Sequence, residues 1–205
     1  MSRPRPDGSD LRRVEPADVP VLAPRLAAAF QDDPGMSWAL SDPARRPDRL
    51  RRSFAELMRR VWLPRGLGHT TTDGVGAALW LPPGEWRLPV SLQLRLTPHM
   101  LRVAGVETWK IVAMNSRAEQ HHPETPHWYL ALLGVDPGAQ GRGYGPHLTR
   151  PILDRCDQEG TPAYLETGTE RNVALYGSMG FEVTGEFDLP RSGPRVWCMW
   201  RDPGG

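Results

Sequence analysis

Three glycines at alternate positions are the first feature of this sequence that could carry chemistry. Gly141, Gly143 and Gly145 lie in the segment QGRGYG, between the apolar stretch WYLALLGV (128–135) and an amphipathic stretch with helical spacing. Glycine lets neighbouring backbone N–H groups converge on one anion, because no Cβ atom intervenes, and the first turn of a following helix adds its own unpaired N–H groups. The segment therefore predicts a phosphate-binding loop between a strand and a helix.

Neither of the common nucleotide-binding loops fits this segment. A Walker A loop requires a lysine after its last glycine, and no lysine lies near residues 140–145. The dinucleotide fingerprint G-x-G-x-x-G requires a glycine at its sixth position, which is Pro146 when the motif starts at Gly141. A glycine cluster of this kind can also be a plain turn, so the neighbouring residues decide the interpretation.

The residues around the loop carry a family resemblance. VDPGAQGRGYGPHL resembles the acetyl-CoA-binding segment of the GNAT acetyltransferase superfamily, whose core Q/R-x-x-G-x-G/A is matched by Gln140, Gly143 and Gly145. The downstream stretch YLETGTERNVALYGSMGFEV is similar to the remainder of that fold in order and spacing. More narrowly, PHWYLALLGVDPGAQGRGYG, PAYLETGTERN, GPRVWCMWR and Pro151, a proline inside the expected helix, resemble the group of puromycin N-acetyltransferase and its relatives.

The resemblance implies acetyl-CoA as the cosubstrate and indicates which residues bind it. Its pyrophosphate would lie on backbone N–H groups of the loop, and its pantetheine arm would run beside the preceding strand. Gly134 suits a β-bulge in that strand, since glycine in a buried strand often marks close approach by another backbone. Asn172 would hydrogen-bond the arm or, alternatively, cap a helix. The implied cofactor-binding residues are Leu133, Gly134, Val135, Gln140, Gly141, Arg142, Gly143, Tyr144, Gly145 and Asn172.

Two residues are candidates for proton transfer. The resemblance implies that Tyr176 is the general acid that protonates the leaving thiolate, whereas the residue taken alone could simply pack beneath a short helix. Glu166 is the candidate base, because it lies near the C-terminal end of a predicted strand beside the cofactor strand; the alternative is a structural carboxylate. Glu124 is a weaker competitor for the base. A main-chain N–H near Leu133 would stabilise the oxyanion that develops during attack.

Three histidines, His121, His122 and His127, raise the question of a metal site. Their spacing matches neither H-E-x-x-H nor another zinc motif, and prolines flank the segment that holds them. We therefore expect polar loop residues here and no bound metal.

Hydrophobic periodicity predicts the elements that position these residues. Strands are expected at 11–14, in a hairpin over 68–84, and at 128–135, 163–167, 181–187 and 196–200; helices are expected at 22–30, 43–62, 88–119 with a break near Pro98, 144–159 and 172–180. This order predicts an α+β fold around a mixed sheet. The resemblance implies a GNAT-like, mostly antiparallel sheet with helices on both faces and a V-shaped opening between the two central parallel strands. We expect residues 11–205 to form a single N-acetyltransferase domain after a disordered tail, residues 1–10.

The bulk composition argues against several classes of function. A net charge of +1 provides no basic field for nucleic acid or an anionic membrane surface. The N-terminus lacks an apolar signal core, and no stretch reaches the ~18 apolar residues of a membrane span, so a cytoplasmic protein is expected. Cys156 and Cys198 suit buried thiols and not a disulfide framework. The arginines between residues 45 and 60 are expected to cover an exposed helix face.

These observations together predict an acetyl-CoA-dependent N-acetyltransferase that moves acetyl directly onto a primary amine of a small molecule. The narrower resemblance makes an aminonucleoside-like or other antibiotic-like amine one candidate acceptor. Two alternatives remain at this stage, a non-catalytic acyl-CoA-binding module and an enzyme that acetylates a protein N-terminus or lysine. The partner is expected to be the small amine, with neither nucleic acid nor membrane involved, and a homodimer is left open.

Overall fold

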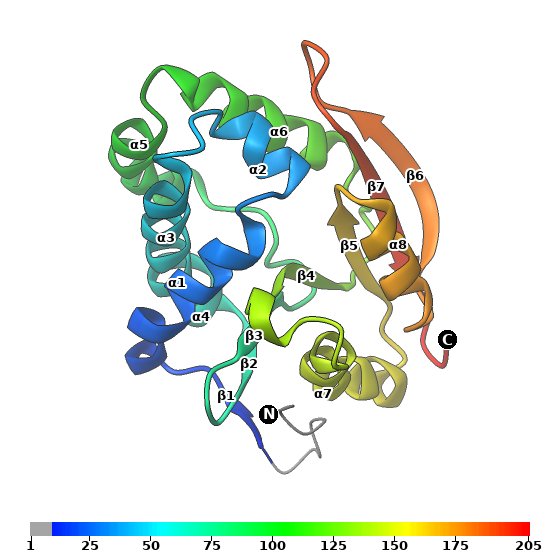
Figure 1. Cartoon of the computed structure of the whole chain (residues 1–205). Helices are drawn as coiled ribbons and strands as arrows, with labels where there is room; N and C mark the ends of the chain where they lie inside the picture. The colour runs from blue at the N-terminus through cyan, green and yellow to red at the C-terminus, as the bar shows by residue number, and fades with distance from the viewer. Residues whose placement is uncertain (1–9) are drawn as a thin grey trace.

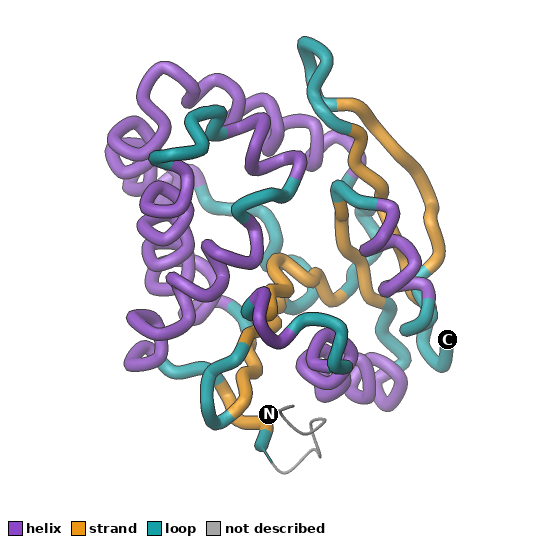
Figure 2. The backbone as a smooth tube through the Cα atoms, viewed as in Figure 1, coloured by secondary structure: helices purple, strands orange, loops and turns teal. Residues whose placement is uncertain are grey.

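Apolar stretches of the chain form one mixed sheet of seven strands (Figure 1 and Figure 2). The computed structural model describes residues 10–205, so the expected tail, residues 1–10, lies outside the described residues except for Asp10. The strands follow the spatial order β1-β2-β3-β4-β5-β7-β6. Their bounds are β1 (Leu11–Arg13), β2 (Leu67–Thr71), β3 (Gly76–Leu81), β4 (Trp128–Val135), β5 (Ala163–Thr167), β6 (Glu182–Asp188) and β7 (Arg195–Arg201).

Helices cover both faces of this sheet, and none of those within residues 10–205 is long and apolar enough to cross a membrane. In Figure 1 the helices of the first half of the chain lie along one side and the top of the molecule, while α7 lies below the sheet. The α-helices are α1 (Val19–Phe30), α2 (Pro34–Ala39), α3 (Arg46–Leu57), α4 (Leu63–Arg65), α5 (Val90–Ala104), α6 (Thr108–His121), α7 (Tyr144–Glu159) and α8 (Glu170–Gly177). Short 3-10 turns occupy Pro16–Asp18, Gly105–Glu107 and Pro137–Ala139, and a π-helical turn occupies Met58–Trp62.

The two central strands, β4 and β5, separate soon after they begin. They pair in parallel only at Trp128 with Ala163 and at Tyr129 with Tyr164, whereas the neighbouring pairs of strands are antiparallel. Beyond those two positions the remainder of β4 and β5 has no ladder between them. The predicted fold class is thereby confirmed, and we call the opening between β4 and β5 the slot.

A β-bulge lies in β4, but at Ala131 and not at Gly134 as the sequence suggested. Leu132 pairs with Leu79 and Leu130 pairs with Trp80, so Ala131 is the additional residue. A bulge resets which face the following side chains point to. Gly134 has a different function, because a Cβ atom there would lie 2.6 Å from Cδ2 of Leu26, and the glycine therefore lets α1 pack closely on the strand.

The sheet separates two hydrophobic cores. On one face, which we call the α1 face, Leu26 of α1 and Leu50 of α3 pack with Leu132, and α2 and α6 cover the part over β5 and β7. On the opposite face, the α7 face, Leu148 of α7 packs with Leu165 of β5. Both cysteines are buried and unbonded, as expected, and burial raises the pKa of the Cys156 thiol to about 12.

The helical half of the chain differs from the sequence prediction in three places. The expected helix over 43–62 is α-helical only over α3 and ends in the π-helical turn, and α2 was not predicted. The break expected near Pro98 falls at Gly105, where a backbone φ of 56° ends α5. Arg46 is buried and Arg49 is half-buried in an ion pair, so these arginines do not belong to an exposed face.

Glu107 connects the turn between α5 and α6 to the rest of the helical half. Its carboxylate accepts hydrogen bonds from the backbone N–H and hydroxyl of Ser41, and forms ion pairs with Arg49 at 2.9 Å and Lys110 at 3.0 Å. Burial by itself would raise the pKa of Glu107, but the hydrogen bonds and the ammonium of Lys110 outweigh it and lower the pKa to about 2.

We expect Glu107→Gln to lower the free energy of unfolding at pH 7 by about 1–2 kcal/mol, after allowing for solvent screening of the pair. A lowered folded-state pKa stabilises the fold above the unfolded value of about 4.5. The difference between wild type and variant should therefore shrink as pH falls from about 4.5 towards 2 in urea titrations. Glu119→Gln, at an exposed position of α6, is the control and should change stability little; an equal loss at pH 3 and pH 7 would contradict the account.

Candidate active site

The slot exposes backbone groups of β4 that point away from β3. Asp136 donates its N–H to the Val75 carbonyl oxygen on the β3 side at 2.9 Å. Because backbone groups alternate along a strand, those of Leu133 and Val135 point to the opposite side, into the slot. The side-chain amide of Gln140 donates to the Val135 oxygen at 3.1 Å, as this orientation requires. An extended ligand can pair with this free edge as an added strand does.

The predicted glycine loop follows directly and is held by its own turn. Asp136 accepts a hydrogen bond from the Gly138 N–H at 2.9 Å, which starts the turn after β4. Gly141 and Gly143 have φ angles of 75° and 88°, a left-handed region in which glycine carries no steric cost. The N–H groups of residues 140–143 donate to no acceptor among residues 10–205 within normal hydrogen-bond geometry. The loop therefore presents free donors for an anion.

The first turn of α7 extends this set of donors. Gly143 caps the helix, which begins at Tyr144, so the N–H groups of Tyr144 and Gly145 have no partner in the preceding turn. Pro146 lacks an N–H at the third helical position, where an N–H would have no intrahelical acceptor either. The side chain of Tyr144 is buried in the core of the α7 face, so this residue offers its backbone to a ligand.

Tyr176 lies on α8, on the α7 face of the slot. Its ring packs edge-on against Phe181 with centroids 6.0 Å apart, and only 7% of the residue is exposed. Its hydroxyl group forms no hydrogen bond with the described residues. Burial, and then the nearby charge of Asp33, raises the pKa of Tyr176 above its ordinary value. The hydroxyl is therefore protonated at neutral pH and not engaged by another side chain of the described chain.

Asp33 is a further candidate site residue, which the sequence interpretation did not single out. It lies in the connection from α1 to α2, where one carboxylate oxygen caps α2 by accepting the Met36 N–H at 2.9 Å. The other oxygen lies beside Gly168, the residue that follows β5. Burial raises the pKa of this carboxyl group, and the N–H groups of Met36 and Gly35 offset part of the effect. Asp33 thus places a carboxylate near Tyr176 at the open end of the slot.

Buried Arg46 holds the segment that carries Asp33. Its guanidinium donates to the carbonyl oxygens of Leu40 at 2.7 Å and Gln31 at 2.8 Å, and a longer hydrogen bond of 3.4 Å reaches Ser41. These contacts fix both ends of α2 relative to α3. The carboxylate of Asp33 is consequently positioned by a cap on one side and by the arginine on the other.

Glu166 lies on β5 beyond the last residue that pairs with β4. It alternates with Leu165, which packs in the core of the α7 face, so its side chain lies on the α1 face. One of its carboxylate oxygens, Oε1, is buried without a hydrogen-bond partner, and the side chain is 12% exposed. Tyr176 and Glu166 therefore approach the slot from opposite faces of the sheet.

Two of the three histidines, His122 and His127, lie in the loop between α6 and β4, as predicted, but their side chains are buried beside Glu166; His121 is instead the last residue of α6. Nδ1 of His122 lies 3.4 Å from Glu166 Oε1, and Nε2 of His122 lies 3.0 Å from Nε2 of His127. Their exposed fractions are 3% for the His122 side chain and 2% for His127. His121 points elsewhere and stacks on Phe187. Among residues 10–205 there is no group of three side chains arranged to hold a metal ion.

Two further predicted residues have less defined surroundings. Asn172 is not the helix cap, because Thr169 caps α8 and accepts the Asn172 backbone N–H at 3.2 Å. The half-buried Asn172 side chain forms no hydrogen bond with the described residues and is free to bind a ligand. Glu124 is exposed and, within residues 10–205, has neither an ion pair nor a side-chain hydrogen bond. Glu166, by contrast, is largely buried beside the slot.

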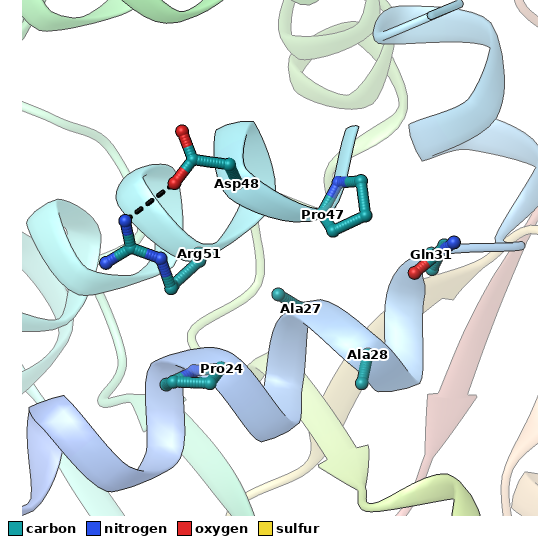
Figure 3. Close-up of a pocket in the computed structure, with 7 residues that line it drawn as sticks. All are labelled: Pro24, Ala27, Ala28, Gln31, Pro47, Asp48 and Arg51. Carbon is teal, nitrogen blue, oxygen red and sulfur yellow. Dashed lines mark hydrogen bonds and ion pairs between the residues drawn. The ribbon is translucent and has the colours of Figure 1, made fainter. Parts of the chain in front are cut away.

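A separate shallow pocket of about 270 Å³ lies between α1 and α3 (Figure 3). Figure 3 shows Pro24 and Ala27 of α1 opposite Asp48 and Arg51 of α3, with an ion pair of 2.6 Å between the last two. Of the residues described above, Gln31 lines this pocket, whereas Asp33, Glu166 and Tyr176 do not.

The comparisons with known proteins decide the family. Residues 77–181, about half of the chain, match the family model of the acetyltransferase (GNAT) family. The chain belongs to the GNAT family of acetyltransferases. An uncharacterized N-acetyltransferase of Schizosaccharomyces pombe is 29% identical over 204 residues, covering 94% of this chain and 83% of that protein. The N-alpha-acetyltransferase RimI of Mycobacterium tuberculosis is 42% identical over 79 residues, which cover 35% of this chain and 47% of its own length.

Solved structures show the same fold. A protein of Corynebacterium glutamicum described as histone acetyltransferase HPA2 and related acetyltransferase superposes with a TM-score of 0.74 at 24% identity, covering 96% of this chain and 97% of its own. The polyamine N-acetyltransferase of Drosophila melanogaster superposes with a TM-score of 0.58 at 16% identity, covering 94% and 98%. At these identities the likeness establishes the fold alone.

The residues present fit the acetyl-CoA that this family uses. The free N–H groups of the glycine loop suit a pyrophosphate, and the open edge at Leu133 and Val135 suits an extended amide-containing arm. The side of Gly145 that would carry a Cβ atom faces Leu133 and Leu175 at 3.7 and 3.6 Å, which are ordinary packing distances. The donors and the free strand edge are continuous, as one elongated ligand requires.

We expect Gly143→Val to weaken acetyl-CoA binding by roughly 10²-fold, the loss of about two hydrogen bonds to a charged group. No described atom lies within 4 Å of a Cβ built at Gly143, so the effect comes from the φ of 88°, which a β-branched residue resists. Isothermal titration calorimetry measures the affinity. Gly185→Val, at a strand glycine with open space and no positive φ, is the control; wild-type affinity in Gly143→Val would overturn the loop assignment.

Proposed function

We propose that this chain transfers the acetyl group of acetyl-CoA directly to the primary amine of a small molecule. One observation carries the proposal. The slot is bounded on the α7 face by the Tyr176 hydroxyl and by the free N–H groups of residues 140–145, which we call the anion cradle. On the α1 face it is bounded by two carboxylates, those of Asp33 and Glu166. An acyl-CoA-binding module without catalysis would need the cradle but neither the tyrosine nor the carboxylates.

The cradle and the free edge of β4 position the acetyl donor, which supplies an acetyl group as a thioester. Binding along Leu133 and Val135 holds the thioester in the slot, and positioning of two reactants in this way lowers the barrier substantially. The N–H of Leu133 points into the slot, where it can donate to the carbonyl oxygen as negative charge develops there.

Proton transfer is divided between the two faces. Asp33 and Glu166 can hold a substrate ammonium by charge, and Glu166 accepts the proton that the amine must lose before it attacks. Tyr176 donates a proton to the sulfur as the C–S bond breaks. Because its pKa is raised, Tyr176 remains protonated until negative charge develops on that sulfur.

Tyr176→Phe should lower kcat by roughly 10²-fold and leave the affinity for acetyl-CoA within about twofold, because only the proton donor is removed. Stopped-flow detection of the released thiol, under conditions in which chemistry limits turnover, gives kcat, and calorimetry gives the affinity. An unchanged kcat would remove Tyr176 from the acid role.

Asp33→Asn tests the binding of the amine separately from the chemistry. Asparagine also caps helices, so α2 is preserved while the charge is lost. We expect KM for the amine to rise by roughly 10-fold or more, as for the loss of a charge-assisted hydrogen bond, with acetyl-CoA affinity unchanged. A wild-type KM for every accepted amine would show that Asp33 does not contact the acceptor.

The proposed acceptor class is tested by thiol release with acetyl-CoA and a panel of amines. The panel includes an aminonucleoside, a polyamine, an arylalkylamine and a peptide with a free N-terminus. The match to RimI favours the peptide as a second candidate, because that relative is an N-alpha-acetyltransferase. Turnover of a small amine supports the proposal; turnover of the peptide alone supports the second candidate, and binding of acetyl-CoA without any turnover supports a binding module.

A further inference from the structure

The side chains of His127, His122 and Glu166 lie in a buried row. The positions of the histidine hydrogens follow from the contact of His127 with a backbone carbonyl. Nδ1 of His127 lies 2.6 Å from the carbonyl oxygen of Thr125. A carbonyl oxygen only accepts, so this nitrogen carries the hydrogen. Burial lowers the pKa of His127, which is therefore neutral at pH 7 and has a bare lone pair on Nε2. His122 must then donate its own Nε2–H to that lone pair, across 3.0 Å.

With the hydrogens assigned in this way, no proton lies between His122 and Glu166. With its hydrogen on Nε2, neutral His122 has a bare lone pair on Nδ1, and this atom faces Glu166 Oε1 at 3.4 Å. Oε1 is itself buried and has no hydrogen-bond partner. Two acceptors that face each other out of water repel, and one added proton between them removes the repulsion. The geometry therefore leaves a position for one proton between these two atoms.

We propose that His122 and Glu166 act as one base, which takes the proton of the acceptor ammonium and holds it between Glu166 Oε1 and His122 Nδ1. The inference rests on the proposed function, because the ammonium is the acceptor of that reaction. His127 and the Thr125 carbonyl orient His122 and do not take the proton themselves. His122 is thus a positioning and proton-sharing residue, while Glu166 contacts the substrate.

The protons balance over one turnover. The ammonium loses one proton to the His122–Glu166 pair, and the free amine forms the C–N bond as the C–S bond breaks. The second N–H proton, lost when the amide forms, balances the proton that Tyr176 gives to the thiolate. The pair then returns its proton to solvent, so the net products are the amide, the thiol and one proton.

The surroundings favour this role over a neutral structural contact. Trp86 stacks on the His122 ring with centroids 3.7 Å apart, and an aromatic face attracts a ring that carries positive charge. Burial, the charge of Glu166 and, at Tyr129, a side-chain hydrogen bond to Glu166 raise the pKa values of Tyr129 and Tyr164, so both tyrosines keep their own protons. The titratable groups that surround the pair are His127, Tyr129, Tyr164 and Cys198.

The hydrogen positions can be measured without a substrate. In the whole protein labelled with ¹⁵N-histidine, long-range ¹H–¹⁵N spectra at pH 7 should show His127 protonated on Nδ1 and bare on Nε2, and His122 protonated on Nε2. His122→Gln and His127→Gln assign the signals. A His127 ring protonated on Nε2, or a His122 ring bare on Nε2, would overturn the inference.

The kinetic test compares His122→Gln with His121→Gln, the same substitution at the exposed neighbour that stacks on Phe187. With the amine that the panel identifies, His122→Gln should lower kcat/KM by about 10–100-fold. The acid limb of the pH profile, where kcat/KM falls as the base becomes protonated, should move to lower pH by about one unit or more. Glutamine can donate to Glu166 but cannot share its proton, so the carboxylate becomes a weaker base. His121→Gln should stay within twofold of wild type.

The outcomes separate the two claims. An acid limb that stays in place while activity falls equally at every pH would mean that His122 is only structural and would overturn this inference. Absence of turnover with every amine in the wild-type enzyme would instead contradict the proposed function, and the NMR result would still decide the hydrogen positions on its own.

Discussion

The site depends on the loss of hydrogen bonding between β4 and β5 after two residue pairs. Backbone groups inside a protein need partners, and a sheet that opens at its centre leaves a row of them unpaired. The N–H groups of Leu133 and Val135 belong to that row, and an extended ligand can pair with them. The bulge at Ala131 turns β4, and the glycine loop begins where the open edge ends. The interrupted ladder between β4 and β5 therefore accounts both for the open centre of the sheet and for the strand edge that a ligand can pair with.

In the proposed reaction, the same interruption lets groups from both faces of the sheet reach the slot. The α7 face contributes the helix N-terminus and Tyr176, while the α1 face contributes Asp33, Glu166 and the histidines. A sheet with a continuous ladder would separate these groups by a layer of backbone. Each group also has a structural anchor of its own: a cap for Asp33, core packing for Tyr176 and the histidine chain for Glu166. Catalytic geometry of this kind is maintained by packing that is remote from the chemistry.

The glycine loop and the strand and helix that flank it have local signals in the sequence. Strand 128–135 and helix 144–159 were predicted with the bounds that the structure has, because a continuous apolar run, a glycine cluster and helical periodicity mark them directly. Asp33 was missed because it comes close to Gly168 and acts on the pKa of Tyr176 only in the folded chain, and both residues are distant from it in sequence. His122 and His127 lie in a loop, as predicted, but their burial beside Glu166 was not anticipated, since Glu166 is distant in sequence and reaches them only through the folded sheet.

The remaining differences also reflect long-range packing. Gly134 was expected to mark a bulge, but the glycine is required by α1, which no periodicity in β4 reveals. Arg46 was grouped with its exposed neighbours, although three carbonyl oxygens from two turns surround it. Pro98 lies within a continuous α5, and the positive φ of Gly105 ends that helix instead.

The most direct test of this account is amide hydrogen exchange at Leu133 and Val135, followed by NMR with and without acetyl-CoA. Both N–H groups point into the slot, so their exchange should be fast in the free protein and should slow by roughly 10-fold or more when the ligand pairs with the strand edge. The Gly134 amide, which points towards β3, should change much less. Unchanged exchange at Leu133 and Val135 with saturating acetyl-CoA would contradict the claim that the ligand completes the interrupted ladder.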